Sequence, residues 1–220
     1  MNDITTAETQ NAATPIAIHT EHGTLHGVLA LPPAASSLIV LAHAGATPDA
    51  GHEALAGTLR EAGMGTVVID LLTQQEDRFA DVHNNVPLLA KRLLDCLALI
   101  KRQMQNDELP ALPIGLYGTD TTSPVVLRVA ALRDHDISAV VCRDGLIDLA
   151  GMLYLRSLES PLLVLLGEAD GTLIASNRRA LNEVACRKAL ELVAERADLA
   201  APGSADAPAS RIAHWFGEHG

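Results

Sequence analysis

Polar residues that could do chemistry stand directly after the short apolar runs of this sequence. Each run reads as a buried strand, and an acid, a histidine or an arginine follows it. Ligands of an open α/β sheet bind beyond the carboxyl ends of its strands, so these residues are the candidates for a site. No serine or cysteine stands out among them as a nucleophile. The candidates are His43, Asp70, Asp120, Arg143, Asp144, Glu168, Asp170 and the segment 195–198.

The segment 114–127 (IGLYGTDTTSPVVL) has the layout of a tight turn from a strand into a helix. Such a turn presents one side chain above the sheet, and its usual catalytic pattern is Gly-x-Ser-x-Gly. Here the frame reads Gly118-Thr119-Asp120-Thr121-Thr122, with an aspartate at the centre. Aspartate and threonine are also common helix N-caps, so the pattern alone favours a capping role.

Composition excludes several classes of partner. The chain holds 27 acidic and 16 basic residues, for a formal charge of −11, which argues against binding to nucleic acid or to an anionic membrane. We see no signal peptide, no run long enough to span a bilayer and no metal or cofactor motif. The cysteines read as buried thiols of a reducing cytosol, so we expect a cytoplasmic protein. They are Cys96, Cys142 and Cys186.

The elements that would position these residues follow from periodicity. We expect one domain over 15–220 after a disordered arm at 1–14, with an antiparallel edge hairpin followed by alternating strands and helices. This is an α/β fold with a mostly parallel sheet and helices on both faces. Helix 86–104 shows the clearest apolar stripe, and Arg92 is placed on its polar face. Expected strands are 15–20, 25–31, 37–42, 65–70, 114–118, 138–142, 161–166 and 189–194; the other expected helices are 50–62, 123–133, 173–187 and 205–217.

Over roughly residues 24–217 the chain resembles the dienelactone hydrolase-like branch of the α/β-hydrolase superfamily. The resemblance rests on LIVLAHAGA (38–46), LREAGMGTVVIDLLTQQE (59–76), LPIGLYGTD (112–120) and PLLVLLGEADGTLIASNRRAL (161–181). It implies a nucleophilic serine or cysteine at the turn after the central strand, an aspartate after a late strand and a histidine after the last strand.

Carried over residue by residue, the resemblance implies an altered site. The nucleophile position falls on Asp120, the acid position on Asp170, and the histidine position on Asp198 within a shortened loop. The segment 195–210 contains no histidine. The residues implied to line a binding site are Ala44, Thr121 and Arg143.

Three carboxylates at one place could not all stay ionised and unpaired. One could be protonated, Arg143 or a hard cation such as Mg²⁺ could neutralise them, or they could diverge; we expect divergence and no bound metal. His43 could approach Asp120, although we expect it instead to fix its own loop by hydrogen bonding.

The sequence therefore predicts a catalytically degenerate hydrolase-like domain, kept for binding a small molecule or a protein partner or for assembly, with a homodimer as one form. The alternative is an unorthodox hydrolase of small esters, lactones or halides that uses Asp120, as haloalkane dehalogenases and epoxide hydrolases use an aspartate.

Overall fold

One mostly parallel sheet organises the chain. The computed structural model describes residues 13–21, 23–45, 50–133, 135–194 and 207–220. The eight strands lie in the order β1-β2-β4-β3-β5-β6-β7-β8, with β2 antiparallel to both of its neighbours and the other pairs parallel. The predicted α/β fold with an antiparallel edge hairpin is confirmed. The strands are β1 (Thr14–Thr20), β2 (Gly23–Ala30), β3 (Leu38–His43), β4 (Gly65–Asp70), β5 (Ile114–Thr119), β6 (Ile137–Arg143), β7 (Leu162–Gly167) and β8 (Lys188–Val193).

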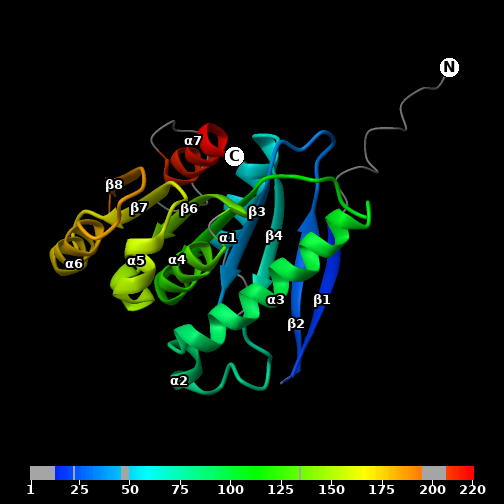
Figure 1. Cartoon of the computed structure of the whole chain (residues 1–220), viewed down its shortest axis with the longest axis horizontal. Helices are drawn as coiled ribbons and strands as arrows, with labels where there is room; N and C mark the ends of the chain where they lie inside the picture. Colours follow the sequence, from blue (N-terminus) through cyan, green and yellow to red (C-terminus); the bar gives the residue numbers. More distant parts are fainter. Residues whose placement is uncertain (1–12, 22, 46–49, 134, 195–206) are drawn as a thin grey trace.

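Helices cover both faces of the sheet (Figure 1). The helices α1 (Ala50–Glu61) and α7 (Pro208–His219) pack on one face. The other face carries α3 (Val86–Gln105), α4 (Ser123–Leu132), α5 (Met152–Ser157) and α6 (Gly171–Leu181). The short helix α2 (Ala80–His83) follows β4 at the bottom of Figure 1, and two 3₁₀ turns follow β5 and β6, at Asp120–Thr122 (η1) and Ile147–Ala150 (η2).

The central strands form because their side chains are apolar on both faces. All of β3 is buried, and so are most residues of β4, β5 and β7, as expected for parallel strands between two helical layers. The helix α3 begins where Asn85 accepts a hydrogen bond from the Leu88 amide, with Pro87 in its first turn. No described helix combines the length and the hydropathy that crossing a bilayer would require.

Three expectations were wrong in detail. Arg92 does not lie on the polar face of α3: it is 1% exposed and donates to the Leu71 carbonyl oxygen at 2.8 Å. The helix predicted at 173–187 spans Gly171–Leu181, and the short helices α2 and α5 were not predicted. Thr14 belongs to β1 rather than to the expected arm, whose residues 1–12 lie outside the described residues.

Candidate functional site

The turn after β5 has the conformation that presents a side chain above a sheet. Thr119 is extended, and Asp120 then adopts a positive φ of 49° at the start of η1. A left-handed backbone is uncommon for a residue other than glycine, and aspartate tolerates it better than most. The Asp120 side chain is exposed just before α4. The structure therefore places the predicted aspartate at the tip of a strand–turn–helix elbow.

Hydroxyl groups beside Asp120 point into the fold. The buried Thr122 hydroxyl lies 2.9 Å from the Ala42 carbonyl oxygen and 2.8 Å from that of Thr119, and it accepts from the Thr119 amide at 2.9 Å. The buried Ser123 hydroxyl lies 3.2 Å from the Gly118 carbonyl oxygen and 3.0 Å from that of Arg143. These side chains fasten the elbow to β3 and β6.

Close packing also fixes the elbow from the side of β6. A Cβ atom added to Gly145 would lie 2.3 Å from the Asp120 carbonyl oxygen and 2.4 Å from the Ser123 Cβ. Only a residue without a side chain fits there, so the backbone after β6 supports the left-handed turn at Asp120.

Arg143, predicted to line the site, is engaged with its own neighbour. Its Nε lies 3.0 Å from Asp144 Oδ2, and Asp144 Oδ1 accepts from the Gly167 amide at 3.1 Å. Burial raises the pKa of the nearby Tyr117 phenol to about 12, against the opposing charge of Arg143. Arg143 thus neutralises the negative charge of Asp144, a carboxylate that the resemblance does not assign to the site.

The structure gives Asp170 a local structural role. Its carboxylate accepts from the Leu173 amide at 2.8 Å and so caps α6. Asp198 lies outside the described residues, so its predicted convergence with Asp120 and Asp170 stays a prediction. Among the described residues, no three His, Cys, Asp or Glu side chains are arranged to hold a metal ion.

His43 lies on the α1 side of the sheet. It is 6% exposed, its Nδ1 lies 3.9 Å from Asp70 Oδ1, and its ring centroid is 5.4 Å from that of His52. The His52 ring in turn meets Tyr117 edge-on at 6.1 Å. A row of polar aromatic rings therefore runs beneath α1 from β3 to β5.

Asp70 and His83 hold the loop after β3. Asp70 Oδ1 accepts from the amides of Gly45 at 3.0 Å and Leu72 at 2.9 Å. His83 Nδ1 lies 3.0 Å from the carbonyl oxygen of Ala44, the residue predicted to line the site at this loop. Thr121, which was predicted to line the site at the elbow, is half-buried in η1.

Sequence reasoning missed His83, because no local motif marks it. Its Nε2 lies 2.8 Å from the Asp77 carbonyl oxygen, so both ring nitrogens face carbonyl oxygens, which can only accept hydrogen bonds. Only the protonated imidazole donates from both nitrogens. The backbone bond at Asp77 is the largest influence on the pKa of His83 and raises it; burial opposes this, and the Ala44 bond with the Asp77 and Asp70 charges adds to the rise.

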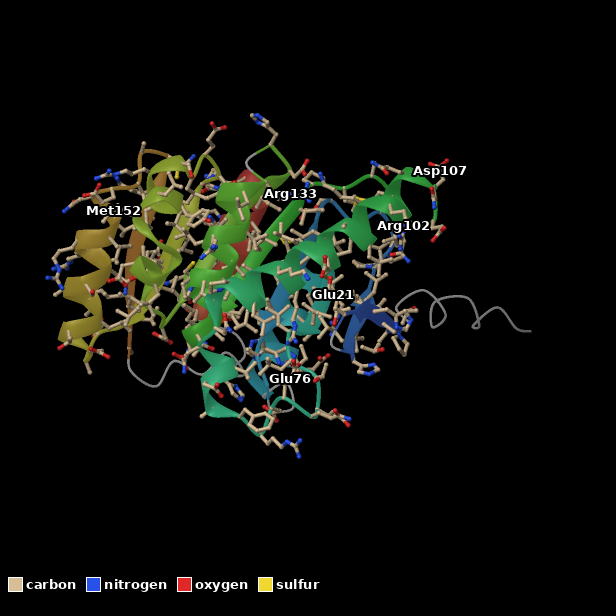
Figure 2. The ribbon with its side chains drawn as sticks, turned by 60° about the horizontal axis from the view of Figure 1, so that its bottom comes forward. Glu21, Glu76, Arg102, Asp107, Arg133 and Met152 are labelled. Carbon is tan, nitrogen blue, oxygen red and sulfur yellow. The ribbon has the colours of Figure 1, made fainter. Side chains whose placement is uncertain are left out.

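Sequence reasoning also missed the ion pair between Glu76 and Arg92. Glu76 lies in the loop between β4 and α2, at the lower edge of the molecule in Figure 2. Burial alone would raise the pKa of Glu76, but hydrogen bonds from Arg92 and Thr73 and the Arg92 charge lower it to about 2. The pair ties this loop to α3.

No family model matches the chain. Two Mycobacterium tuberculosis proteins named as candidate phosphoribosyl transferases are 30% identical over 196 residues, which is 88% of this chain and 43% of theirs. The chain thus spans less than half the length of these relatives.

Solved structures match along nearly the whole chain. A dienelactone hydrolase from Anabaena variabilis superposes with a TM-score of 0.84 at 28% identity, over 96% of this chain and 99% of that one. The protein Est1E from Butyrivibrio proteoclasticus has a TM-score of 0.70 at 13% identity, over 93% and 98% of the two chains, which is a likeness of fold alone. The chain therefore has the α/β-hydrolase fold and is similar to a dienelactone hydrolase along nearly its whole length.

Proposed function

We propose that this α/β-hydrolase-fold protein does not hydrolyse esters by the serine mechanism and acts by binding a small molecule or a partner. The observation that carries the proposal is the elbow itself. Its tip presents the Asp120 carboxylate, while the hydroxyls of Thr122 and Ser123 bond inward to backbone carbonyl oxygens. A carboxylate on a turn built for an activated hydroxyl or thiol is a poor acyl-transfer nucleophile without a histidine to activate water.

The other groups at this edge support the same proposal. Asp170 caps α6 and Arg143 pairs with Asp144, so both have structural partners. The thiols offer no substitute, because burial raises the pKa of Cys96 to about 12 and also raises the pKa of Cys142 and of Cys186. A thiol with a raised pKa is not a thiolate near neutrality.

An exposed apolar segment supports a partner role. The turn η2 and the helix α5, which follow β6, expose Leu146, Leu149, Met152 and Leu153, and Leu153 is 71% exposed. Figure 2 shows Met152 at the surface at the start of α5. Neighbouring apolar side chains that remain in water are typical of interaction surfaces.

A second candidate function is hydrolysis through Asp120 itself. The left-handed φ and the exposure of Asp120 favour it, since a nucleophile at the elbow needs both. An ester formed on Asp120 would still need a base to activate water. His43 is a candidate for that base because it ends β3, but it contacts Asp70 and His52 on the α1 side of the sheet.

Phosphoribosyl transfer, which the names of the Mycobacterium relatives suggest, has weaker support. A phosphoribosyl donor carries phosphates, and helix N-termini with cationic side chains are their usual site. Here the Asp120 carboxylate stands before α4, and Arg143 at this edge pairs with Asp144. We therefore do not propose that activity for this chain.

The test is a hydrolysis panel of p-nitrophenyl esters, small lactones and small halides, measured with the wild type and with Asp120→Asn. The proposal expects equal rates for both proteins and the buffer. Turnover that Asp120→Asn removes would instead establish the aspartate-dependent hydrolase.

A further inference from the structure

A cavity on the α1 face of the sheet is separate from the elbow. It has a volume of about 430 Å³ and lies over β2 and β4 beside α1. Neither Asp120 nor Asp170 belongs to its lining. The size falls in the range of pockets that bind small organic molecules, roughly 300–1,000 Å³.

The floor of the cavity is apolar. Val28 of β2 and Val68 of β4 are direct cross-strand partners, and Leu72 extends the same lining. Val28 is 43% exposed although it lies on an interior strand of the sheet, where such side chains are ordinarily covered. The helices α1 and α7 contact β3, β4 and β6, and the exposure of Val28 shows that this part of β2 is less covered.

One wall is polar and fixed in place. His43 is nine-tenths buried yet lines the cavity, and Asp70 beside it is held by the Gly45 and Leu72 amides. Gly45 has a φ of 73°, and a Cβ atom there would lie 2.0 Å from Asp77 Oδ1. Asp77 also lies 3.4 Å from His83 Nε2, so its carboxylate is positioned by packing as well as by charge.

The rim carries negative charge. Carboxylates of Glu53, Asp70 and Asp77 line the cavity, whereas no lysine or arginine does. Two cationic side chains contact these acids from outside the lining: Arg60 lies 3.2 Å from Glu53, and His83 lies 3.4 Å from Asp77. The three carboxylates outnumber these two side chains, so the rim keeps a net negative charge. Such a rim attracts a cation and repels phosphates and carboxylates.

We propose that this cavity binds a small organic monocation, an amine or quaternary ammonium with an apolar body. The apolar body packs on Val28 and Val68, and the cationic head meets the carboxylates of Asp77 and Glu53. This inference rests on the proposed binding function, for which it names the site and the ligand class. It makes no use of the elbow residues.

The probes are benzylamine, its neutral analogue benzyl alcohol and its anionic analogue benzoate, titrated into the full chain and followed by NMR chemical shifts. Benzylamine is expected to bind saturably, benzyl alcohol about fivefold more weakly, and benzoate not at all. Added salt weakens the benzylamine complex, because the rim is partly exposed. Equal binding of the three probes, or no binding of benzylamine, overturns the proposal.

Matched variants locate the complex. Asp77→Asn and Glu53→Gln are each expected to weaken benzylamine binding about threefold, while Asp81→Asn and Glu61→Gln, exposed acids outside the lining, leave it unchanged. Val28→Trp fills the floor and abolishes binding, and an unchanged thermal midpoint shows that this variant is folded. Benzylamine binding that persists in Val28→Trp contradicts the assignment.

The two proposals fail separately. Hydrolysis that depends on Asp120 would overturn the proposed function and leave the cation complex measurable. Loss of the cation complex with no hydrolysis would overturn this inference alone.

Discussion

At the scale of single residues, Asp120 holds a backbone conformation that glycine adopts more readily. Because Asp120 has a φ of 49°, removing its whole side chain should raise the free energy of unfolding, and removing only its polar group should lower it. We expect Asp120→Gly to be more stable than Asp120→Ala by about 1 kcal/mol. Urea denaturation of the two variants measures the difference.

Ala98 provides a control position at which glycine should lower the stability relative to alanine. Ala98 is exposed within α3, and Ala98→Gly there should lower the free energy of unfolding by about 1 kcal/mol. If glycine were less stabilising than alanine at both positions, the strained elbow would not exist in solution.

Glu76 and Arg92 form the charged pair with the largest consequence for stability. Glu76→Gln removes the partner of an almost fully buried guanidinium, and we expect a loss of about 2–3 kcal/mol at pH 7. Because the folded pKa of Glu76, about 2, is below its ordinary 4.5, this stabilisation is complete above pH 4.5 and disappears as the pH falls toward 2.

Urea denaturation of wild type and Glu76→Gln between pH 7 and pH 2 measures this effect. The gap between the two proteins should close as the pH falls. Glu108→Gln, at an exposed site, should follow the wild type throughout. A gap that stays constant with pH would mean that the ion pair does not stabilise the fold.

At the scale of elements, the N-terminus of α6 depends on Asp170. Asp170→Ala removes the acceptor of the Leu173 amide and should cost about 1 kcal/mol, whereas Asp170→Ser should retain most of the stability. Thermal unfolding compares the two variants. Equal stability of all three proteins would show that Asp170 is free for another role.

The helix α2 is attached to the loop after β3 through His83, whose two ring nitrogens face the carbonyl oxygens of Ala44 and Asp77. Because the pKa of His83 is raised, its contribution to stability is complete below about pH 6.5 and is lost as the pH rises through the folded pKa. Amide hydrogen exchange over 76–85 should therefore speed up with pH beyond the intrinsic rate. In His83→Ala exchange is fast at every pH, and in the exposed-site control His135→Ala it matches the wild type. Protection that His83→Ala leaves intact would contradict the attachment.

At the scale of the whole molecule, the sheet and most helices were predictable because apolar periodicity is a local signal. Strands such as 65–70 and helices such as 86–104 agree with the structure within a residue or so. The short helices α2 and α5 carry too few residues for a period to show. The prediction for Arg92 failed because a charged side chain is ordinarily expected to face water, whereas its guanidinium donates to the Leu71 carbonyl oxygen after β4, a contact that no local pattern reveals.

The site was predictable only in part, for the same physical reason. Asp120 lies in a strand–turn–helix frame, so its place followed from local order. His83 and the cavity over Val28 and Val68 depend on segments that meet only in the folded sheet. Asp70 was among the candidate residues, but its hold on the Gly45 amide is a tertiary contact.

The central claim, that the elbow carries no acyl-transfer nucleophile, is tested most directly by a single-turnover experiment. Protein in excess over p-nitrophenyl acetate reveals even one acylation event, which steady-state rates would hide. We predict that the wild type releases p-nitrophenolate at the rate seen with Asp120→Asn and with buffer. Release of p-nitrophenolate that consumes all of the limiting substrate faster than in buffer, and that disappears in Asp120→Asn, would contradict it.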